Sequence, residues 1–219
     1  MQRPSRATHA QTIADELRRL IRSGELPAGT HLRQLEVARS FAVSITPVRE
    51  AFTALAREGF VRQDAHRGVV VFVPSVADLR ENYEIRIALE PLATELAATQ
   101  ITDAQLAELE ALVAEMRVAI RKDLPRYASE LNPTFHALIY RAALRPRLAE
   151  IIEQLRDASA AYLQLLVLKP QPARYLNSAH REHEEILAAL GAHARERAAE
   201  AMRLHLEHNR DQILASLPG

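Results

Sequence analysis

Residues 44–60, with the sequence SITPVREAFTALAREGF, decide how the first third of this chain folds. The apolar residues Val48 and Phe52 repeat at the spacing of one helix face, which predicts an amphipathic helix. Thr46 is a suitable N-cap for this helix, and Gly59 is a suitable C-terminal stop. We therefore expect one short helix with a polar outer face.

The segments on either side of this stretch predict two further helices before it and a β-hairpin after it. Helical spacing of apolar residues predicts a helix over 12–21, which ends at the Gly- and Pro-containing segment 23–30, and a second helix over 33–41. After the third helix, residues 60–73 contain two β-rich runs around a polar turn that ends in Gly68, which indicates a hairpin. Three helices followed by a hairpin are typical of a winged helix-turn-helix.

The rest of the chain has a different pattern, in which helical spacing continues without strand signals. We expect a mainly α fold, with a winged helix-turn-helix DNA-binding domain at 1–74 and an all-helical bundle at 75–219. Six helices are predicted in the bundle, over 76–99, 103–121, 124–142, 146–168, 173–191 and 194–215.

Composition narrows the class of protein. The chain has no cysteine, which excludes a disulfide framework and a thiolate metal site. It shows no apolar core of a signal peptide and no apolar run of membrane-spanning length, so we expect a cytoplasmic protein without membrane contact. Residues 1–74 hold 11 Arg and 7 acidic residues, a net charge of +4, whereas the remaining 17 basic and 21 acidic residues give −4. The basic first domain is the expected contact for a polyanion.

The third predicted helix begins with groups that suit contact with double-stranded DNA. The hydroxyls of Ser44 and Thr46 lie at a helix start, where exposed backbone N–H groups also favour phosphate oxygens. Arg49 follows one turn later and has a side chain suited to a bidentate contact with guanine. The predicted hairpin turn adds His66 and Arg67. An ordinary capped helix with a surface arginine has the same spacing, so the pattern alone leaves both interpretations open.

Residues 21–71 closely resemble the DNA-binding domain of the GntR family of bacterial transcription regulators. The shared features include IRSGELPAGTHL near the start, VSITPVREA in the middle, and EGFV followed by a glycine in the wing. Ile45 stands where the family usually has an arginine, and Val37 stands where leucine is usual. The resemblance implies DNA contacts from these residues: Arg33, Ser44, Thr46, Arg49, His66 and Gly68.

Three histidines, His136, His183 and His205, fall on or near the apolar stripes of three predicted helices. Converging imidazoles suit Zn²⁺, Ni²⁺ and similar divalent ions. Asn132 lies four residues before His136 on the same helix face, where its amide oxygen would be a fourth ligand. A lone histidine at such a position is more often a buried, hydrogen-bonded residue, and spacing does not show that the helices converge.

The second half resembles the FCD ligand-binding domain of the FadR subfamily of GntR regulators, through EIRIALEPLATELAA at 84–98 and the settings of the three histidines. That domain often carries Asp-x-x-x-His, so the resemblance assigns the metal to Asn132, His136, His183 and His205. Asn132 replaces the usual aspartate, so the charge of the ion is not compensated by these ligands. Either metal binding is weaker, or an anionic effector supplies the missing charge.

The resemblance implies that a small carboxylate meets the metal in the bundle. Arg86 is the expected second anchor for this effector through its planar guanidinium, although an i,i+4 pair with Glu90 is an equal alternative. Tyr140 is expected to line the cavity. His180 and His208 are expected to face solvent.

The overall interpretation is a homodimeric repressor on a pseudo-palindromic operator, not an enzyme. Two alternatives remain at this point. One is a regulator with a metal-free site for an acyl or other ligand. The other is a helical metal-dependent hydrolase, because three histidines around an ion with open positions can activate water.

Overall fold

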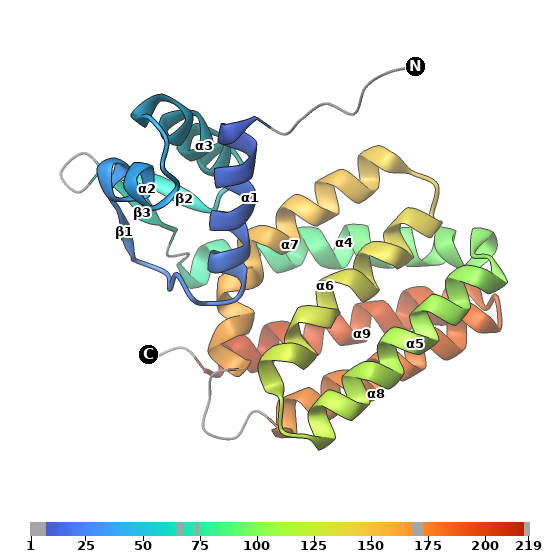
Figure 1. Ribbon diagram of the computed structural model, residues 1–219. Coiled ribbons are helices and arrows are strands. Elements are labelled where there is room, and N and C mark those ends of the chain that lie inside the picture. The colour runs from blue at the N-terminus through green and yellow to red at the C-terminus, as the bar shows by residue number, and fades with distance from the viewer. Residues whose placement is uncertain (1–7, 65–67, 73–74, 168–172, 217–219) are drawn as a thin grey trace, which may run out of the picture. The chain divides into compact units, whose positions relative to one another are not determined.

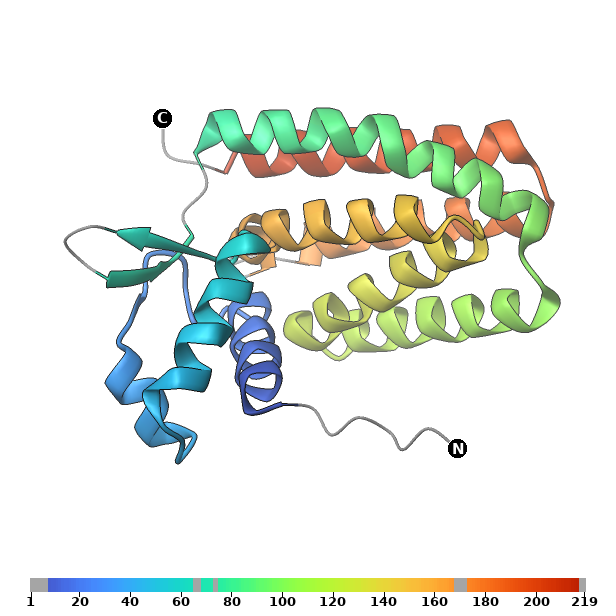
Figure 2. The same cartoon turned by 90° about the horizontal axis from the view of Figure 1, so that it is seen from above.

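The computed structural model describes residues 8–64, 68–72, 75–167 and 173–216. The chain divides into two compact units, Met1–Val73 and Pro74–Gly219. Figures 1 and 2 show the elements of each unit. Among the described residues, no helix combines the length and the apolar character needed to cross a membrane.

The first unit is a winged helix-turn-helix, as predicted. Its three helices and three strands follow each other as α1 (His9–Arg22), β1 (His31–Leu32), α2 (Gln34–Ser40), α3 (Ile45–Arg57), β2 (Val61–Asp64) and β3 (Gly68–Val71). The sheet is antiparallel with the order β1-β3-β2. Its core is formed by apolar residues from all three helices and from the strands, with Ile13, Val48, Leu55 and Val71 at most 1 % exposed.

Three details of this unit differ from the prediction. Helix α1 begins at His9, because a capping box between Thr8 and Gln11 starts a polar first turn that carries no apolar signal. Helix α3 has Ser44 as its N-cap in place of Thr46, which lies inside the first turn. Pro47 follows in that same turn, where backbone N–H groups need no partner within the helix. Strand β1 was not predicted.

The second unit contains the six predicted helices, each within two residues of the expected bounds. They are α4 (Val76–Gln100), α5 (Asp103–Arg121), α6 (Pro125–Ala142), α7 (Pro146–Val167), α8 (Ala173–Gly191) and α9 (Arg195–Leu214). The mainly α fold is thereby confirmed. Capping boxes start α4 at Ser75 and α5 at Thr102, and proline occupies the first position of α6 and α7.

The most extensive helix contact of the second unit is between α4 and α9, which run side by side along one edge of the unit (Figure 2). Helix α6 lies against α4, α5 and α7, and α8 lies against α5 and α9. Leu79, Phe135, Ile186 and Met202 are fully buried members of one apolar core drawn from these helices. The same core also encloses several polar and charged side chains from α4, α6, α7, α8 and α9.

Candidate functional site

The outer face of α3 carries exposed polar side chains at the start of the helix. Ser44, the N-cap, makes no capping hydrogen bond through its side chain, so its hydroxyl is available to an outside partner. Thr46 and Arg49 are exposed, whereas Val48 is completely buried on the opposite side. An open hollow of about 500 Å³ runs along the exposed side and is lined by Thr46, Arg49, Glu50, Thr53, Ala54 and Arg57.

Arg49 is free to bind a partner outside the protein. Its guanidinium has no hydrogen bond or ion pair with any residue in the described part of the chain. Arg33, which precedes α2, instead contacts Glu36 at 3.2 Å, and the two side chains are 77 % and 63 % exposed. An exposed pair of this kind contributes at most about 1 kcal/mol. Arg33 can therefore leave Glu36 for a phosphate at small cost.

The hairpin turn is only partly described. Gly68 begins β3 with a φ of 76°, in the left-handed region that favours glycine, and a Cβ placed there would meet open space. His66 and Arg67, the other wing residues expected to contact DNA, lie outside the described residues.

The second unit encloses three histidines that come from three different helices. His136 of α6, His183 of α8 and His205 of α9 are 0 %, 3 % and 1 % exposed. One ring nitrogen of each lies within 4.8 Å of those of the other two. The ring centroids are 4.8 to 5.3 Å apart. The fold thus brings together the three histidines that the sequence analysis selected.

A hydrogen-bonded chain orients the first of these rings. Nδ1 of His136 lies 3.1 Å from the hydroxyl of Tyr140, one turn later on α6, and that hydroxyl donates to Glu90 of α4. Because the hydroxyl uses its proton on Glu90, it accepts the proton of Nδ1. Nε2 of His136 is then left with its lone pair and has no partner among the described residues.

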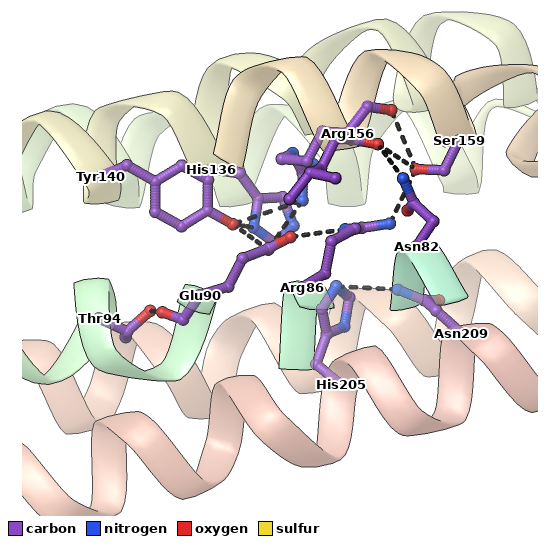
Figure 3. Close-up of polar contacts among 11 residues, drawn as sticks. Asn82, Arg86, Glu90, Thr94, His136, Tyr140, Arg156, Ser159, His205 and Asn209 are labelled. Atoms are coloured by element: carbon purple, nitrogen blue, oxygen red, sulfur yellow. Dashed lines mark hydrogen bonds and ion pairs between the residues drawn. The ribbon is translucent and has the colours of Figure 1, made fainter. Parts of the chain in front are cut away.

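Glu90 is the centre of a buried charged group (Figure 3). Its carboxylate accepts from Nε of Arg86 at 2.6 Å and from Nη1 of Arg156 of α7 at 3.2 Å, in addition to Tyr140. Arg86 also donates to the hydroxyl of Ser159 at 2.9 Å. Burial acts to raise the pKa of Glu90, but the attraction of Arg86 and Arg156 outweighs it and lowers that pKa. Glu90 is therefore a carboxylate at neutral pH.

A second carboxylate orients His205. Nδ1 of this ring lies 2.8 Å from Oε2 of Glu182 on α8, and Nε2 lies 3.0 Å from the amide nitrogen of Asn209. An amide nitrogen is a donor, so Nε2 carries the lone pair and Nδ1 donates to Glu182. Glu182 also contacts His208, and Asn209 accepts a hydrogen bond from Tyr175. A carboxylate behind an imidazole fixes the ring and raises its basicity as a metal ligand.

The histidine cluster fits a divalent metal ion by the chemistry of its donors. Burial, and then the nearby positive charges, lower the pKa of His136 well below its usual value, and burial likewise lowers that of His183. The two rings are thus neutral, as metal ligands must be. Neither nitrogen of His183 has a partner among the described residues. The separations of up to 4.8 Å exceed the roughly 3.3 Å between ligands on a tetrahedral ion, so binding would draw the rings closer.

The other predicted site residues take different positions. Asn132 is half-buried on α6, one turn before His136, and its side chain has no hydrogen bond to a described residue. Arg86 is 2 % exposed and forms the i,i+4 pair with Glu90 that was its alternative role. Tyr140 is 1 % exposed and joins His136 to Glu90.

Two histidines were expected to face solvent, and that expectation is wrong for His180. His180 is 7 % exposed because it packs within α8 against α5, where Nε2 accepts a hydrogen bond from Arg117 at 3.1 Å. His208 is about one-third exposed and contacts Glu182. Sequence analysis also missed Arg156, Glu182 and Asn209. Their only local signal is the i,i+4 spacing of Asn209 from His205 and the position of Glu182 next to His183.

Comparison with known proteins gives two family matches that together span most of the chain. Residues 9–71 match the family described as bacterial regulatory proteins, gntR family. Residues 81–208 match the FCD domain. The first range covers the helix-turn-helix and its wing, and the second includes the whole group around Glu90 and the three histidines.

Individual relatives extend over both units. The chain is 33 % identical over 206 residues to the transcriptional repressor RspR of Escherichia coli K12, which covers 93 % of this chain and 88 % of the relative. It is 29 % identical to the gluconate operon transcriptional repressor of Bacillus licheniformis, over 74 % of this chain and 66 % of the relative. Among solved structures, E. coli McbR/YncC matches with a TM-score of 0.86 and 27 % identity, over 96 % of this chain and 99 % of that one.

Proposed function

Because this chain belongs to the GntR family of bacterial regulatory proteins and carries an FCD domain, we propose that it is a transcriptional repressor whose DNA binding is controlled by a small carboxylate. The carboxylate binds beside a divalent metal ion in the helical unit, and the winged unit binds the operator. The two named repressors among its relatives support the direction of control.

The observation that carries this proposal is the buried histidine cluster. One ring nitrogen from each of the three imidazoles lies within 4.8 Å of the other two in the interior of a helical bundle. Nε2 of His136 and both ring nitrogens of His183 have no hydrogen-bond partner among the described residues. A buried polar atom without a partner costs about 1–3 kcal/mol. Such a cluster is therefore expected to serve a ligand and not stability alone.

The metal ion would be held by His136, His183 and His205, with the amide oxygen of Asn132 as the fourth protein ligand. A Zn²⁺ or Ni²⁺ ion bound there supplies a Lewis-acidic centre that a carboxylate oxygen can coordinate. Tyr140 holds the proton of His136 on Nδ1, which leaves the lone pair of Nε2 for the ion. Arg86, which is paired with Glu90, adds a positive charge that attracts the carboxylate of the effector.

DNA binding is assigned to the start of α3 and to the wing. Arg49, with no partner among the described residues, would contact a base edge, while Ser44 and Thr46 would bind phosphates at the helix start. Arg33, His66, Arg67 and Gly68 complete the proposed set. A homodimer would place two such helices on the half-sites of a pseudo-palindromic operator.

A metalloenzyme is the less favoured alternative. A hydrolase of this kind needs a general base near the metal-bound water. The carboxylates of Glu90 and Glu182 are each engaged, with Arg86 and Arg156 or with His205 and His208. The family match over the winged unit also supports a regulator. A metal-free ligand site is the second alternative, and the experiment below separates it.

Elemental analysis tests the metal. The untagged protein is expected to hold about one Zn²⁺ or Ni²⁺ per chain, which the His183→Ala variant loses because it lacks a central ligand. The His9→Ala variant, altered on the exposed first turn of α1, is the control and should keep the ion. Metal-free wild-type protein after reconstitution with either ion would reject the metal site and leave the metal-free alternative.

Fluorescence anisotropy tests the DNA-binding assignment, with a duplex selected by the wild-type protein from a random library. Arg49→Ala should weaken binding by at least about tenfold at fixed salt, the effect of losing one specific base contact. Arg121→Ala, which removes an exposed arginine of α5, is the control for loss of charge. Equal affinities of the two variants would contradict the role of Arg49.

A further inference from the structure

Four ionised side chains surround the three histidines in the described part of the helical unit. Arg86 and Arg156 are positive, and Glu90 and Glu182 are negative. Arg86, Glu90 and Arg156 form one contact group, and Glu182 contacts His205 directly. The four formal charges cancel, so the metal-free site is balanced.

The carboxylates of Glu90 and Glu182 already have partners within the protein. Glu90 holds two guanidiniums and fixes His136 through Tyr140, and Glu182 holds His205 and His208. Their charges therefore balance the arginines and orient two of the imidazoles. They do not compensate a further positive charge.

A divalent ion in this site would add two positive charges to a balanced, buried group. The neutral imidazoles and the amide of Asn132 contribute no negative charge to offset them. An uncompensated charge in a protein interior is costly, and proteins avoid it by pairing. The missing negative charge must then come from the ligand that accompanies the ion.

We propose that the effector of this site is a dianion with two separate carboxylates, and that a monoanion of similar size binds much less well. This inference rests on the proposed function. One carboxylate would meet the metal, and the other would meet Arg156. Arg156 is the guanidinium available to a second acceptor, because only its Nη1 has hydrogen-bond partners among the described residues, Glu90 at 3.2 Å and the hydroxyl of Tyr140 at 3.4 Å.

The proposal makes the preferred charge of the ligand depend on two positions. Asn132→Asp adds one negative charge next to the ion, so a monoanion then completes the balance. Glu90→Gln removes one, so a ligand with three negative charges becomes preferred. Because Asn132 is half-buried and has no hydrogen bond to a described residue, the aspartate variant is expected to fold normally and is the main test.

The experiment measures binding of matched probes to the Ni²⁺-loaded full-length protein by calorimetry at pH 8, where free imidazoles are mostly neutral. The probes are succinamate, succinate and tricarballylate, with one, two and three negative charges. Wild-type protein should bind succinate at least about tenfold more tightly than succinamate, since each added charge interacts at short range in a poorly screened site. In Asn132→Asp this preference should fall by about tenfold.

The matched control is Gln100→Glu, which adds one negative charge on the same unit. Gln100 is exposed at the end of α4, ten residues and about 15 Å along the helix from Glu90. This variant should keep the wild-type preference. Glu90→Gln, if folded by circular dichroism, should bind tricarballylate relatively better than wild type does.

The outcomes separate the two proposals. If Ni²⁺ does not bind, the metal site of the proposed function fails, and the charge argument fails with it. If Ni²⁺ binds but succinamate equals succinate, or none of the probes binds, the dianion is wrong while the metal site stands. An unchanged preference in Asn132→Asp would also overturn the inference, because it would show that the charge beside the ion does not select the ligand.

Discussion

Replacing Glu90 by glutamine in the metal-free protein is expected to destabilise the helical unit by about 3–5 kcal/mol. Glu90 is completely buried and accepts from Arg86 at 2.6 Å, from Arg156 at 3.2 Å and from Tyr140. Glutamine keeps the shape of the side chain but removes the charge that both guanidiniums face. Removal of one partner from a buried ion pair costs about 3–5 kcal/mol, because the remaining charge is buried without compensation.

The same substitution at Glu95 is the control. Glu95 lies on the same helix and pairs with Arg195 at 2.8 Å, with side chains that are 32 % and 56 % exposed. Water screens this pair, so Glu95→Gln should cost at most about 1 kcal/mol. The two variants differ in burial and in the number of partners, not in the chemistry of the replacement.

Unfolding in urea, followed by far-ultraviolet circular dichroism, measures the difference, because the chain has no tryptophan to serve as a fluorescent probe. Differential scanning calorimetry resolves the helical unit from the winged unit if the two unfold separately. The expected loss corresponds to a fall in Tm of roughly 10 °C for a unit of this size. If Glu90→Gln costs no more than Glu95→Gln, Glu90 does not compensate the two arginines, and the charge balance proposed for the site is wrong.

Three further changes have distinct expected results. Tyr140→Phe removes the acceptor of the Nδ1 proton of His136 and should weaken Ni²⁺ binding about 10- to 100-fold in a calorimetric titration, whereas Tyr127→Phe, on the exposed face of α6, should not. Lowering the pH from about 6 to 5 should destabilise the metal-free protein by up to about 2.7 kcal/mol per pH unit, measured in urea. Burial lowers the pKa values of His136 and His183, so both rings stay neutral in the folded state. The same two rings take up protons in the unfolded chain below a pH of about 6.5. Stability therefore falls as the pH decreases through this range. A flat profile in this range would show that the two rings are protonated in the folded protein. Ile45 is the first residue of α3 and is 40 % exposed. Ile45→Arg should tighten binding to random duplex DNA and steepen the slope of log K against log salt concentration by about 0.9, the effect of one added phosphate contact. An unchanged slope would mean that residue 45 does not reach the phosphates.

The fold was predictable from sequence because its signals are local. Thr102 with Gln105 starts α5, and proline at 125 and 146 starts α6 and α7, so these borders need no knowledge of packing. Strand β1 is the opposite case. Its two residues are a strand only because His31 and Leu32 pair with Val70 and Val69 of β3.

The candidate site was predictable only in part, for the same reason. Each histidine lies on an apolar helix face, and that pattern, together with the resemblance, selected the three that converge. The charged group could not be found this way. Arg156 is 66 residues from Glu90 in sequence, and nothing in the sequence around Arg156 distinguishes it from a solvent-facing arginine until α7 packs against α4. The sequence indicates Glu90 only as an i,i+4 partner of Arg86.

The position of the site on α4 also bears on how the effect of a bound ligand would be transmitted to the DNA-binding unit. Arg86 and Glu90 lie on α4, which is one continuous helix from Val76 onward and directly follows the winged unit in sequence. Arg86 is ten residues, about 15 Å, from the first residue of that helix. A ligand that draws Arg156 away from Glu90 would change the contacts of α4 with α7 on the stretch of α4 that precedes Pro91 and leads back to the winged unit. Suppose that α4 has two arrangements relative to α7. An effector that binds one of them more tightly would raise the population of that arrangement, and such a difference in affinity is the condition that any allosteric control must meet.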